Sequence, residues 1–402
     1  MRIGCYFAAV IILLLSTERN SFLQKFEELY PGGAVKVSGK IKDSLLTGKW
    51  THYYEDGTVK ETGKYKRGKR KGLWESFHDN GTPEEAGKYV IGRKEGEWRG
   101  YYPNETQGYY GNFQDGIEHG EWKFYFPNGN LQRKGQYYEG KQYGTWIYYY
   151  VGGSYKQMGF WNEGEKNGDW TSYYPNGNKK ETGSMQRGLK IGLWKFYYSD
   201  ESPSAKGRFQ RDRAEGEWEY YYPNGQMKEK GSWENDKAIG MWEYFYQDGT
   251  LWKKGKWKDS IQDGLWEYYY KNGKKSKEGS FKNGVTIGRW VYYYENGEKK
   301  EAGSYNVEGQ QEGLWEVFAS DGTLIRSGNY TKNVQTGYWK YYYENGKLKE
   351  EGSWNDQKQD GLWKYYHENG NLRKEGQWKN GEAIGQWKLY DENGQLSQTV
   401  TY

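Results

Sequence analysis

Apolar positions along this chain are occupied mainly by aromatic rings, and the rings recur at a fixed interval. Eleven tryptophans from Trp50 to Trp290 stand 24 residues apart, and after one extra residue the same spacing resumes from Trp315 to Trp387. A fixed period of this length is typical of tandem structural repeats rather than of one irregular globule. The fold can therefore be predicted for a single repeat and then extended along the chain.

Most repeats carry two short aromatic-rich runs on either side of an Asn-Gly or Asp-Gly pair. In the repeat that starts at Gly337, the runs Trp339–Tyr343 and Gly352–Trp354 flank Asn345-Gly346. Asn-Gly between β-prone runs is a strong hairpin signal, because a type I′ turn needs positive φ at both central residues. The pattern predicts one β-hairpin per repeat.

The second run of each hairpin contains a recurring glycine. It lies 13 residues after every periodic tryptophan but the last, usually with an aromatic residue two positions later, as in Gly63 and Tyr65 or Gly231 and Trp233. Glycine inside a strand is locally unfavourable, so its recurrence indicates a close approach by another group. We expect an aromatic ring from a neighbouring repeat to cover each of these glycines.

The segments between hairpins are polar and end in glycine, as in Asn355–Gly361, and we expect them to be loops. The one extra residue, between Tyr305 and Gly313, falls in such a segment, where an insertion shifts no strand register. Two repeats break the Asn-Gly pattern, at Pro103–Gly108 and Ser199–Pro203, and their hairpin loops are expected to differ from the others.

The period extends from Phe26 to Tyr402, which predicts an all-β fold: an elongated tandem array of about sixteen hairpins over residues 21–402. The pattern G-x-W-x-x-Y-Y-x-N-G, followed by G-x-[YW] and x-x-G, resembles the MORN repeat, in the variant form found in bacterial proteins labelled as YwqK-family antitoxin components. This resemblance implies a twisted row of antiparallel hairpins used for protein contacts, and sometimes proposed for lipid contacts. The 24-residue spacing departs from the eukaryotic form of the repeat.

The first twenty residues differ in kind from the rest. Arg2 precedes an apolar run from Ile3 to Leu15, and polar residues follow at once. This arrangement resembles a secretory signal peptide, with an uncleaved N-terminal anchor as the alternative, and predicts a secreted or cell-envelope protein. Such a leader departs from a cytoplasmic antitoxin. Cys5 is the single cysteine, so disulfides cannot stabilise the predicted array.

Composition argues against several classes of function. The 59 basic and 54 acidic residues are interspersed, which is typical of a solvated surface rather than of a nucleic-acid site, and no basic face for a lipid surface is evident. The four histidines, His52, His78, His119 and His367, have no matched ligand at metal spacing. No nucleophile elbow or phosphate loop is present. We expect a non-enzymatic protein without cofactor or metal.

The remaining candidate for a functional site is the surface of the predicted array. Side chains alternate along a strand, so the residue three after each periodic tryptophan points to the opposite face, and it is aromatic in all fifteen tryptophan repeats. These rings either pack on one another or stay partly open to a partner. The candidate partner-binding row is Tyr125, Tyr149, Tyr173, Tyr197, Tyr221 and Tyr269.

These features predict an interaction scaffold that binds a protein partner. An antitoxin or immunity-type partner that neutralises a toxin, a cell-surface glycan-binding module, a lipid-surface binder and a passive spacer remain alternatives. The oligomeric state is left open.

Overall fold

The computed structural model describes residues 22–402, and all the regular structure in that range is β-strand: 32 strands without a helix. This confirms the predicted all-β class and the tandem hairpins. The predicted signal peptide or anchor over residues 1–20 lies outside the described residues. Within residues 22–402, no helix is long and apolar enough to cross a membrane.

The chain divides into two compact units, the first ending at Glu201 and the second running from Ser202 to Tyr402. The strands of the first unit are β1 (Gln24–Leu29), β2 (Val35–Lys42), β3 (Leu45–Tyr53), β4 (Val59–Lys66), β5 (Lys69–Phe77), β6 (Pro83–Val90), β7 (Arg93–Tyr101), β8 (Gln107–Gln114), β9 (Ile117–Tyr125), β10 (Leu131–Tyr138), β11 (Lys141–Tyr149), β12 (Tyr155–Asn162), β13 (Glu165–Tyr173), β14 (Lys179–Gln186) and β15 (Leu189–Tyr197).

The strands of the second unit are β16 (Pro203–Gln210), β17 (Arg213–Tyr221), β18 (Met227–Glu234), β19 (Lys237–Phe245), β20 (Leu251–Lys258), β21 (Ile261–Tyr269), β22 (Lys275–Lys282), β23 (Val285–Tyr293), β24 (Lys299–Tyr305), β25 (Gln311–Phe318), β26 (Leu324–Thr331), β27 (Val334–Tyr342), β28 (Leu348–Asn355), β29 (Lys358–Tyr366), β30 (Leu372–Lys379), β31 (Glu382–Tyr390) and β32 (Leu396–Thr401).

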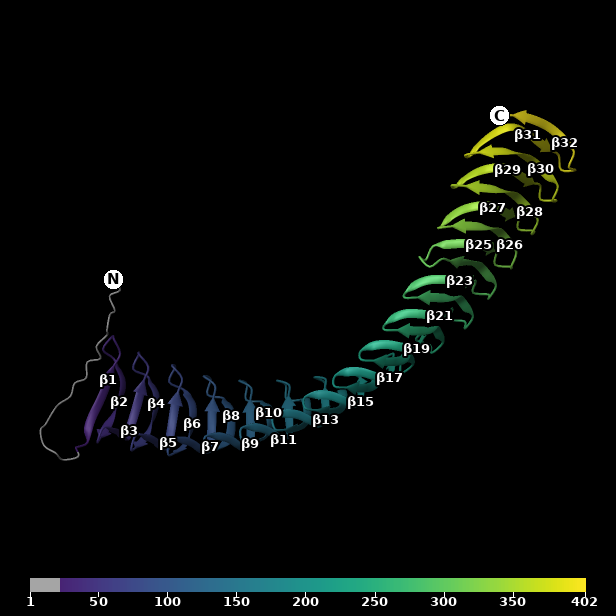
Figure 1. Cartoon of the computed structure of the whole chain (residues 1–402). Helices are drawn as coiled ribbons and strands as arrows, with labels where there is room; N and C mark the ends of the chain where they lie inside the picture. Colours follow the sequence, from purple (N-terminus) through teal and green to yellow (C-terminus); the bar gives the residue numbers. More distant parts are fainter. Residues whose placement is uncertain (1–21) are drawn as a thin grey trace, which may run out of the picture. The chain divides into compact units, whose positions relative to one another are not determined.

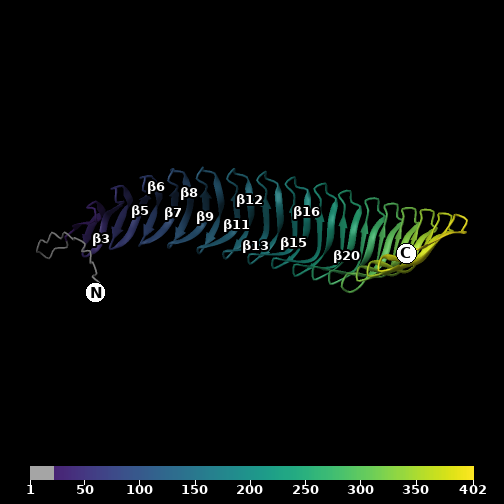
Figure 2. The same cartoon turned by 90° about the horizontal axis from the view of Figure 1, so that it is seen from above.

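Within each unit, every strand pairs antiparallel with its neighbours in the chain, so the strands follow one another in chain order (Figure 1). The turns that join them lie along two opposite edges of each unit (Figure 2). The register places the periodic tryptophans opposite the glycine of their own hairpin, as Trp50 opposite Gly63 and Trp339 opposite Gly352, except that Trp387 stands opposite Val400.

The recurring glycine is covered as predicted, by the tryptophan of the next repeat. A Cβ atom on Gly63 would lie 2.2 Å from Cδ2 of Trp74, so only glycine fits beneath the indole. The indole Nε1 of Trp74 donates to the carbonyl of Lys64 at 3.2 Å, which holds the ring in place. The close approach therefore explains a residue that strand propensity alone would disfavour.

The core of each unit is a series of rings, interrupted in the first unit by Met185 between Trp170 and Trp194. Tyr65 lies edge-on between two tryptophans, with ring centroids 5.8 Å from Trp50 and 5.0 Å from Trp74. Similar contacts recur along the chain, and each of the fifteen periodic tryptophans is at most 5% exposed. Aromatic rings thus supply the apolar burial that the scarce aliphatic residues cannot.

The hairpin turns do not have the predicted type I′ geometry. In the turn from Tyr54 to Thr58, the amide of Tyr54 donates to the carbonyl of Thr58 at 2.7 Å, and the amide of Gly57 donates to the carbonyl of Tyr54 at 3.0 Å. Only Gly57 has positive φ, because the carboxylate of Asp56 accepts the amide of Thr58 at 2.8 Å and stabilises the turn without a second left-handed residue.

The predicted loops between repeats are also wrong: apart from residues 306–310, where the extra residue lies, they are two-residue turns. β28 ends at Asn355 and β29 begins at Lys358, with Asp356 and Gln357 at φ of 46° and 61°. These turns, rather than the Asn-Gly pairs, have positive φ at both central residues. Polar residues can extend the strands here because pairing on both sides satisfies their backbone groups while their side chains reach solvent.

The two repeats without Asn-Gly do not form different turns. The amide of Tyr102 donates to the carbonyl of Thr106 and that of Glu105 to the carbonyl of Tyr102, both at 2.8 Å, with Glu105 at φ 63° in the glycine position. Glu201 donates in the same way to Tyr198. By contrast, the extra residue lies in a turn as predicted, between β24 and β25.

Candidate functional site

Each sheet has two chemically distinct faces. The tryptophan face carries the periodic tryptophans and the aromatic residues two positions after the recurring glycines. The tyrosine face, on the opposite side, carries the residues adjacent to those glycines and the residues three after each tryptophan. Pairing supports this division, since Tyr149 stands opposite Tyr155 and the hydroxyl of Tyr173 contacts Sδ of Met158 at 3.6 Å, where Met158 adjoins Gly159.

All six tyrosines of the predicted row are half-buried, so none is fully packed away. The structure brings two of them together: Tyr155 lies between Tyr149 and Tyr173, with ring centroids 5.4 and 5.9 Å away. Burial, with a smaller contribution from Tyr155, raises the pKa of both Tyr149 and Tyr173. Both therefore keep their hydroxyl protons at neutral pH.

The other four occupy different surroundings. Tyr125 and Tyr197 accept, through their backbone carbonyls, the hydroxyls of Tyr102 and Tyr174. In the second unit, Tyr221 donates its hydroxyl to Glu219, and Tyr269 lies beside Lys254, whose Nζ is 6.0 Å from the ring centroid. The predicted row is thus not chemically uniform.

Further rings, missed by the sequence analysis, extend the tyrosine face around Tyr149. Four of them follow one another across β9 to β12: centroids are 5.7 Å apart for His119 and Tyr138, 6.2 Å for Tyr138 and Tyr143, and 6.0 Å for Tyr143 and Phe160. Tyr138 is 56% exposed, Tyr143 44% and Phe160 39%. We define the aromatic cluster as His119, Tyr138, Tyr143, Tyr149, Tyr155, Met158, Phe160 and Tyr173.

The sequence did hold a signal for these residues, namely departure from the repeat's own pattern. Tyr138 stands where other repeats have Lys66, Asn162 and Gln186. Tyr143 stands where others have Lys71 and Asn167, and Phe160 where others have Lys64, Gln136 and Ser184. These positions are polar in most repeats, with Ile at the position of Tyr143 in four of them, and are aromatic here on an exposed face.

The tyrosine face of the second unit is charged instead. Lys206 and Glu219 form an ion pair at 2.9 Å, as do Lys254 and Glu267, and Lys275 contacts Glu267 at 2.7 Å. Burial acts to raise the pKa of Glu267, but hydrogen bonds from Lys275 and Lys254 outweigh it and lower that pKa. This charged surface contrasts with the aromatic cluster of the first unit.

Residues that could hold a metal are not grouped in the part of the chain that the structure describes: no three His, Cys, Asp or Glu side chains come together as a ligand set there. The nitrogen Nε2 of His78 hydrogen-bonds the carbonyl of Tyr101 at 3.0 Å, and that of His367 the carbonyl of Tyr390 at 3.2 Å. These two rings therefore connect one repeat to the next, as tyrosines do elsewhere.

Comparison with protein families gives the repeat its name. Nine segments match the model described as "MORN repeat variant", namely residues 46–67, 118–138, 166–186, 214–235, 262–283, 287–306, 335–356, 359–380 and 384–402. Nine of the chain's repeats match this MORN repeat variant. The matches recur along both units and follow the hairpins of the structure, so the MORN resemblance is confirmed, whereas the likeness to the YwqK subset stays a prediction.

Comparison with curated proteins gave no match. Among solved structures, a TcdB2-TccC3 crystal structure is 10% identical over 94% of this chain and 26% of that chain, with a TM-score of 0.15. A Photorhabdus luminescens Tc holotoxin pore structure is 12% identical over 92% and 23%, also at 0.15. This chain spans about a quarter of the length of those chains.

Proposed function

We propose that this MORN-repeat protein is a non-enzymatic scaffold that binds a protein partner through the aromatic cluster of its tyrosine face. One observation carries the proposal: Tyr138, Tyr143 and Phe160 are exposed rings, and the position of Phe160 is polar in every other tryptophan repeat, while those of Tyr138 and Tyr143 are polar in most. The exposed part of such a ring contributes nothing to burial in the core, so its place on this face points to a contact outside the chain.

The composition of the cluster fits the centre of a protein interface. Such centres are enriched in aromatic residues and Met and depleted of Lys, Glu and Asp. The cluster contains Met158 among its tyrosines, whereas the same face of the second unit carries Lys–Glu pairs such as Lys254 and Glu267. Tyrosines on a paired sheet have few rotamers to lose on binding, which makes them good contact residues.

The test is affinity capture with residues 21–402 as bait, in the native host, with mass spectrometry of the retained proteins. The variant replaces Tyr138, Tyr143 and Phe160 together by Ser. The matched control is Tyr338→Ser, which removes a ring that is 48% exposed in the second unit. We expect one stoichiometric protein with the native bait and the control, and its loss with the triple variant.

Other results would change the proposal. If the partner stays bound to the triple variant, the aromatic cluster is not its site. Retention only on envelope polysaccharide, released by free sugar, would favour the glycan-binding alternative. A captured toxin whose activity falls on binding would favour the antitoxin alternative.

We also propose that the protein is exported, because the apolar run from Ile3 to Leu15 follows Arg2 and precedes polar residues. Fractionation of host cells with N-terminal sequencing of the mature protein is the test. Protein found only in the cytoplasm, with its first residues intact, would contradict export.

A further inference from the structure

The tryptophan face contains a second repeated position, two residues after each periodic tryptophan, which we call the cover position. In most repeats it holds a ring packed beside the tryptophan: Tyr244 lies 6.0 Å from Trp242, and Tyr341 lies 6.0 Å from Trp339. The rings at this position are Phe124, Tyr148, Phe196, Tyr220, Tyr244, Tyr268, Tyr292, Tyr341 and Tyr365. They form an outer layer over the buried indoles.

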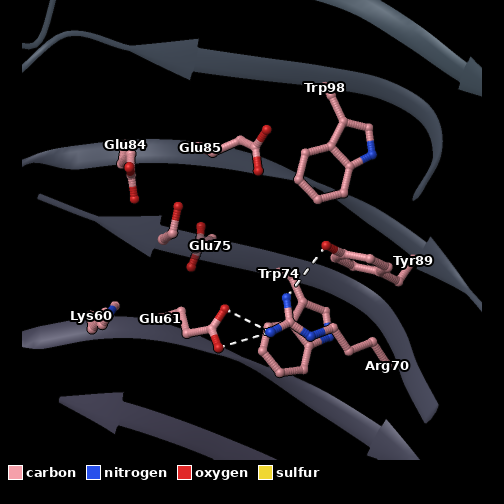
Figure 3. A pocket seen from close by; sticks show the side chains of 10 residues that line it. Lys60, Glu61, Arg70, Trp74, Glu75, Glu84, Glu85, Tyr89 and Trp98 are labelled. Atoms are coloured by element: carbon pink, nitrogen blue, oxygen red, sulfur yellow. Dashed lines mark hydrogen bonds and ion pairs between the residues drawn. The ribbon is translucent and has the colours of Figure 1, made fainter. Parts of the chain in front are cut away.

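The layer is interrupted by Ser172, whose hydroxyl donates to Glu181 at 3.4 Å, and by Ser76. Ser76 occupies the cover position of Trp74, and beside it lies a pocket of about 210 Å³ lined by Arg70, Trp74, Tyr89 and Trp98 among others (Figure 3). At Gly100, the cover position of the next repeat, the ring of Tyr109 takes the place instead, since a Cβ there would lie 2.0 Å from that ring. Ser76 has no such substitute on its paired strands, where it stands opposite Glu61 and Glu85.

Three of the charged residues that line the pocket, Glu61, Arg70 and Glu85, are paired. Arg70 donates to both carboxylate oxygens of Glu61, at 2.8 and 2.9 Å, and to the hydroxyl of Tyr89 at 3.3 Å (Figure 3). Glu85 accepts from Lys94 at 2.5 Å and from the hydroxyl of Tyr109. Beside Ser76 the pocket therefore presents rings together with paired charges, and its remaining charged lining is Lys60, Glu75 and Glu84.

Another repeat shows what the Ser76 repeat lacks. In the repeat of Trp194, Lys190 pairs with Glu181 at 2.8 Å and lies 4.1 Å from the indole centroid, as Arg70 pairs with Glu61 and lies 4.0 Å from Trp74. That repeat also has Phe196 at its cover position, 6.4 Å from Trp194 and 5.1 Å from Lys190. A ring, a cation and an indole thus coexist there, and only the ring is missing at Ser76.

We propose that the pocket beside Ser76 accepts an aromatic side chain, Phe or Tyr, from a protein partner. The ring would lie where Phe196 lies in its own repeat, against the neighbouring indole and within reach of the Arg70 guanidinium, which favours a ring face. This inference rests on the proposed function in that a protein supplies the ring. It concerns the opposite face, however, and its test uses an isolated ring, so it can fail independently.

The test uses the full chain and N-acetyl-para-fluorophenylalanine amide as the probe, followed by fluorine NMR line broadening. Three variants define the site. Ser76→Phe supplies the ring from the chain itself, Ser76→Ala leaves the space open, and Ser280→Phe adds a ring on the tyrosine face at a position that already carries Phe160 in another repeat. Circular dichroism melts establish that each variant is folded.

We expect broadening with the native chain, Ser76→Ala and Ser280→Phe, competition by N-acetyl-tyrosine amide, and loss of broadening with Ser76→Phe. Ser76→Phe should melt no lower than the native chain, since the Trp194 repeat already holds this combination. Absence of broadening with the native chain, or equal broadening with Ser76→Phe, would overturn the proposal. Competition by methylguanidinium but not by the tyrosine amide would reassign the pocket to a cation.

Discussion

At the residue scale, the recurring glycine is the position with the least freedom. The indole of the following repeat packs into the space that a side chain would fill at this glycine. The carbonyl of the residue after the glycine accepts the indole N–H, as Lys64 does from Trp74. One methyl group at this position would force the indole away from the strand, because a densely packed ring has nowhere to move.

We predict that Gly159→Ala destabilises the first unit by about 1–3 kcal/mol, because the new Cβ would lie 2.3 Å from Cδ2 of Trp170 and overpack the core. Urea unfolding followed by tryptophan fluorescence measures the effect. The matched control in the same hairpin is Gly152→Ala, where nothing lies within 4 Å of the added Cβ. The control should leave the midpoint unchanged or raise it slightly, and an equal loss in both variants would contradict the steric account.

At the scale of the element, a hairpin is stabilised by its neighbours as much as by its own pairing. The hydroxyl of Tyr246, just after β19, donates at 2.9 Å to the carbonyl of Tyr269, at the end of β21. Tyr222 does the same to Phe245. Each strand packs mainly against the strands that precede and follow it in the chain. Adding or removing a whole period therefore preserves the environment of the remaining repeats.

Deletion of residues 264–287, one full period, should therefore leave a folded β-protein. The deletion joins Asp263 to Gly288, which is equivalent to Gly264 in the repeat pattern, so both faces keep their residues. Circular dichroism should retain the β signal, with a modest fall in melting temperature from the shorter array.

The control deletes half a period, residues 264–275. It removes the end of β21 and its hairpin turn, and so places tryptophan-face residues out of register with their neighbours. We expect an insoluble or unfolded product. Loss of all β signal after the full-period deletion would refute the nearest-neighbour account.

At the scale of the whole molecule, both units depend on one kind of side chain. Half-buried tyrosines lie beside the periodic tryptophans in each unit. Burial raises the pKa of Tyr148 and Tyr220, and it raises the pKa of Tyr244 to about 12. In Tyr244 the hydroxyl also accepts the indole N–H of Trp257 at 3.0 Å. Ionisation of such a phenol would place a charge against the core.

This predicts a loss of stability in alkali. A tyrosine whose folded pKa lies above its unfolded value, about 10, contributes stability that is fully present below the unfolded pKa and is lost as pH rises through the folded pKa. The urea midpoint should fall as pH rises from about 10 towards 12. The readout specific to tyrosine is tyrosinate absorbance, which should appear at higher pH in the folded chain than in urea. Identical titration curves in the two states would rule out this explanation.

Much of the fold could be predicted because its causes are local or periodic. The regular spacing from Trp50 to Trp387 predicts the hairpins, and the recurring glycine, such as Gly63, predicts the ring that covers it. Both predictions rest on steric requirements that are the same in every repeat. The turns were predicted less well. Asp356-Gln357 forms a tight turn without glycine, because strand pairing on both sides compensates for an unfavourable backbone conformation.

The sequence by itself determined the all-β class, the period and the likeness of the repeats to MORN repeats. It also determined that tryptophans and tyrosines lie on opposite faces, because all of these follow from residue spacing and side-chain size. Only the tertiary structure decided which rings stay open: Tyr143 and Phe160 meet across two strands, and Ser76 borders a pocket. Exposure depends on what the neighbouring strands bring alongside a residue, and that is a property of packing rather than of any one repeat.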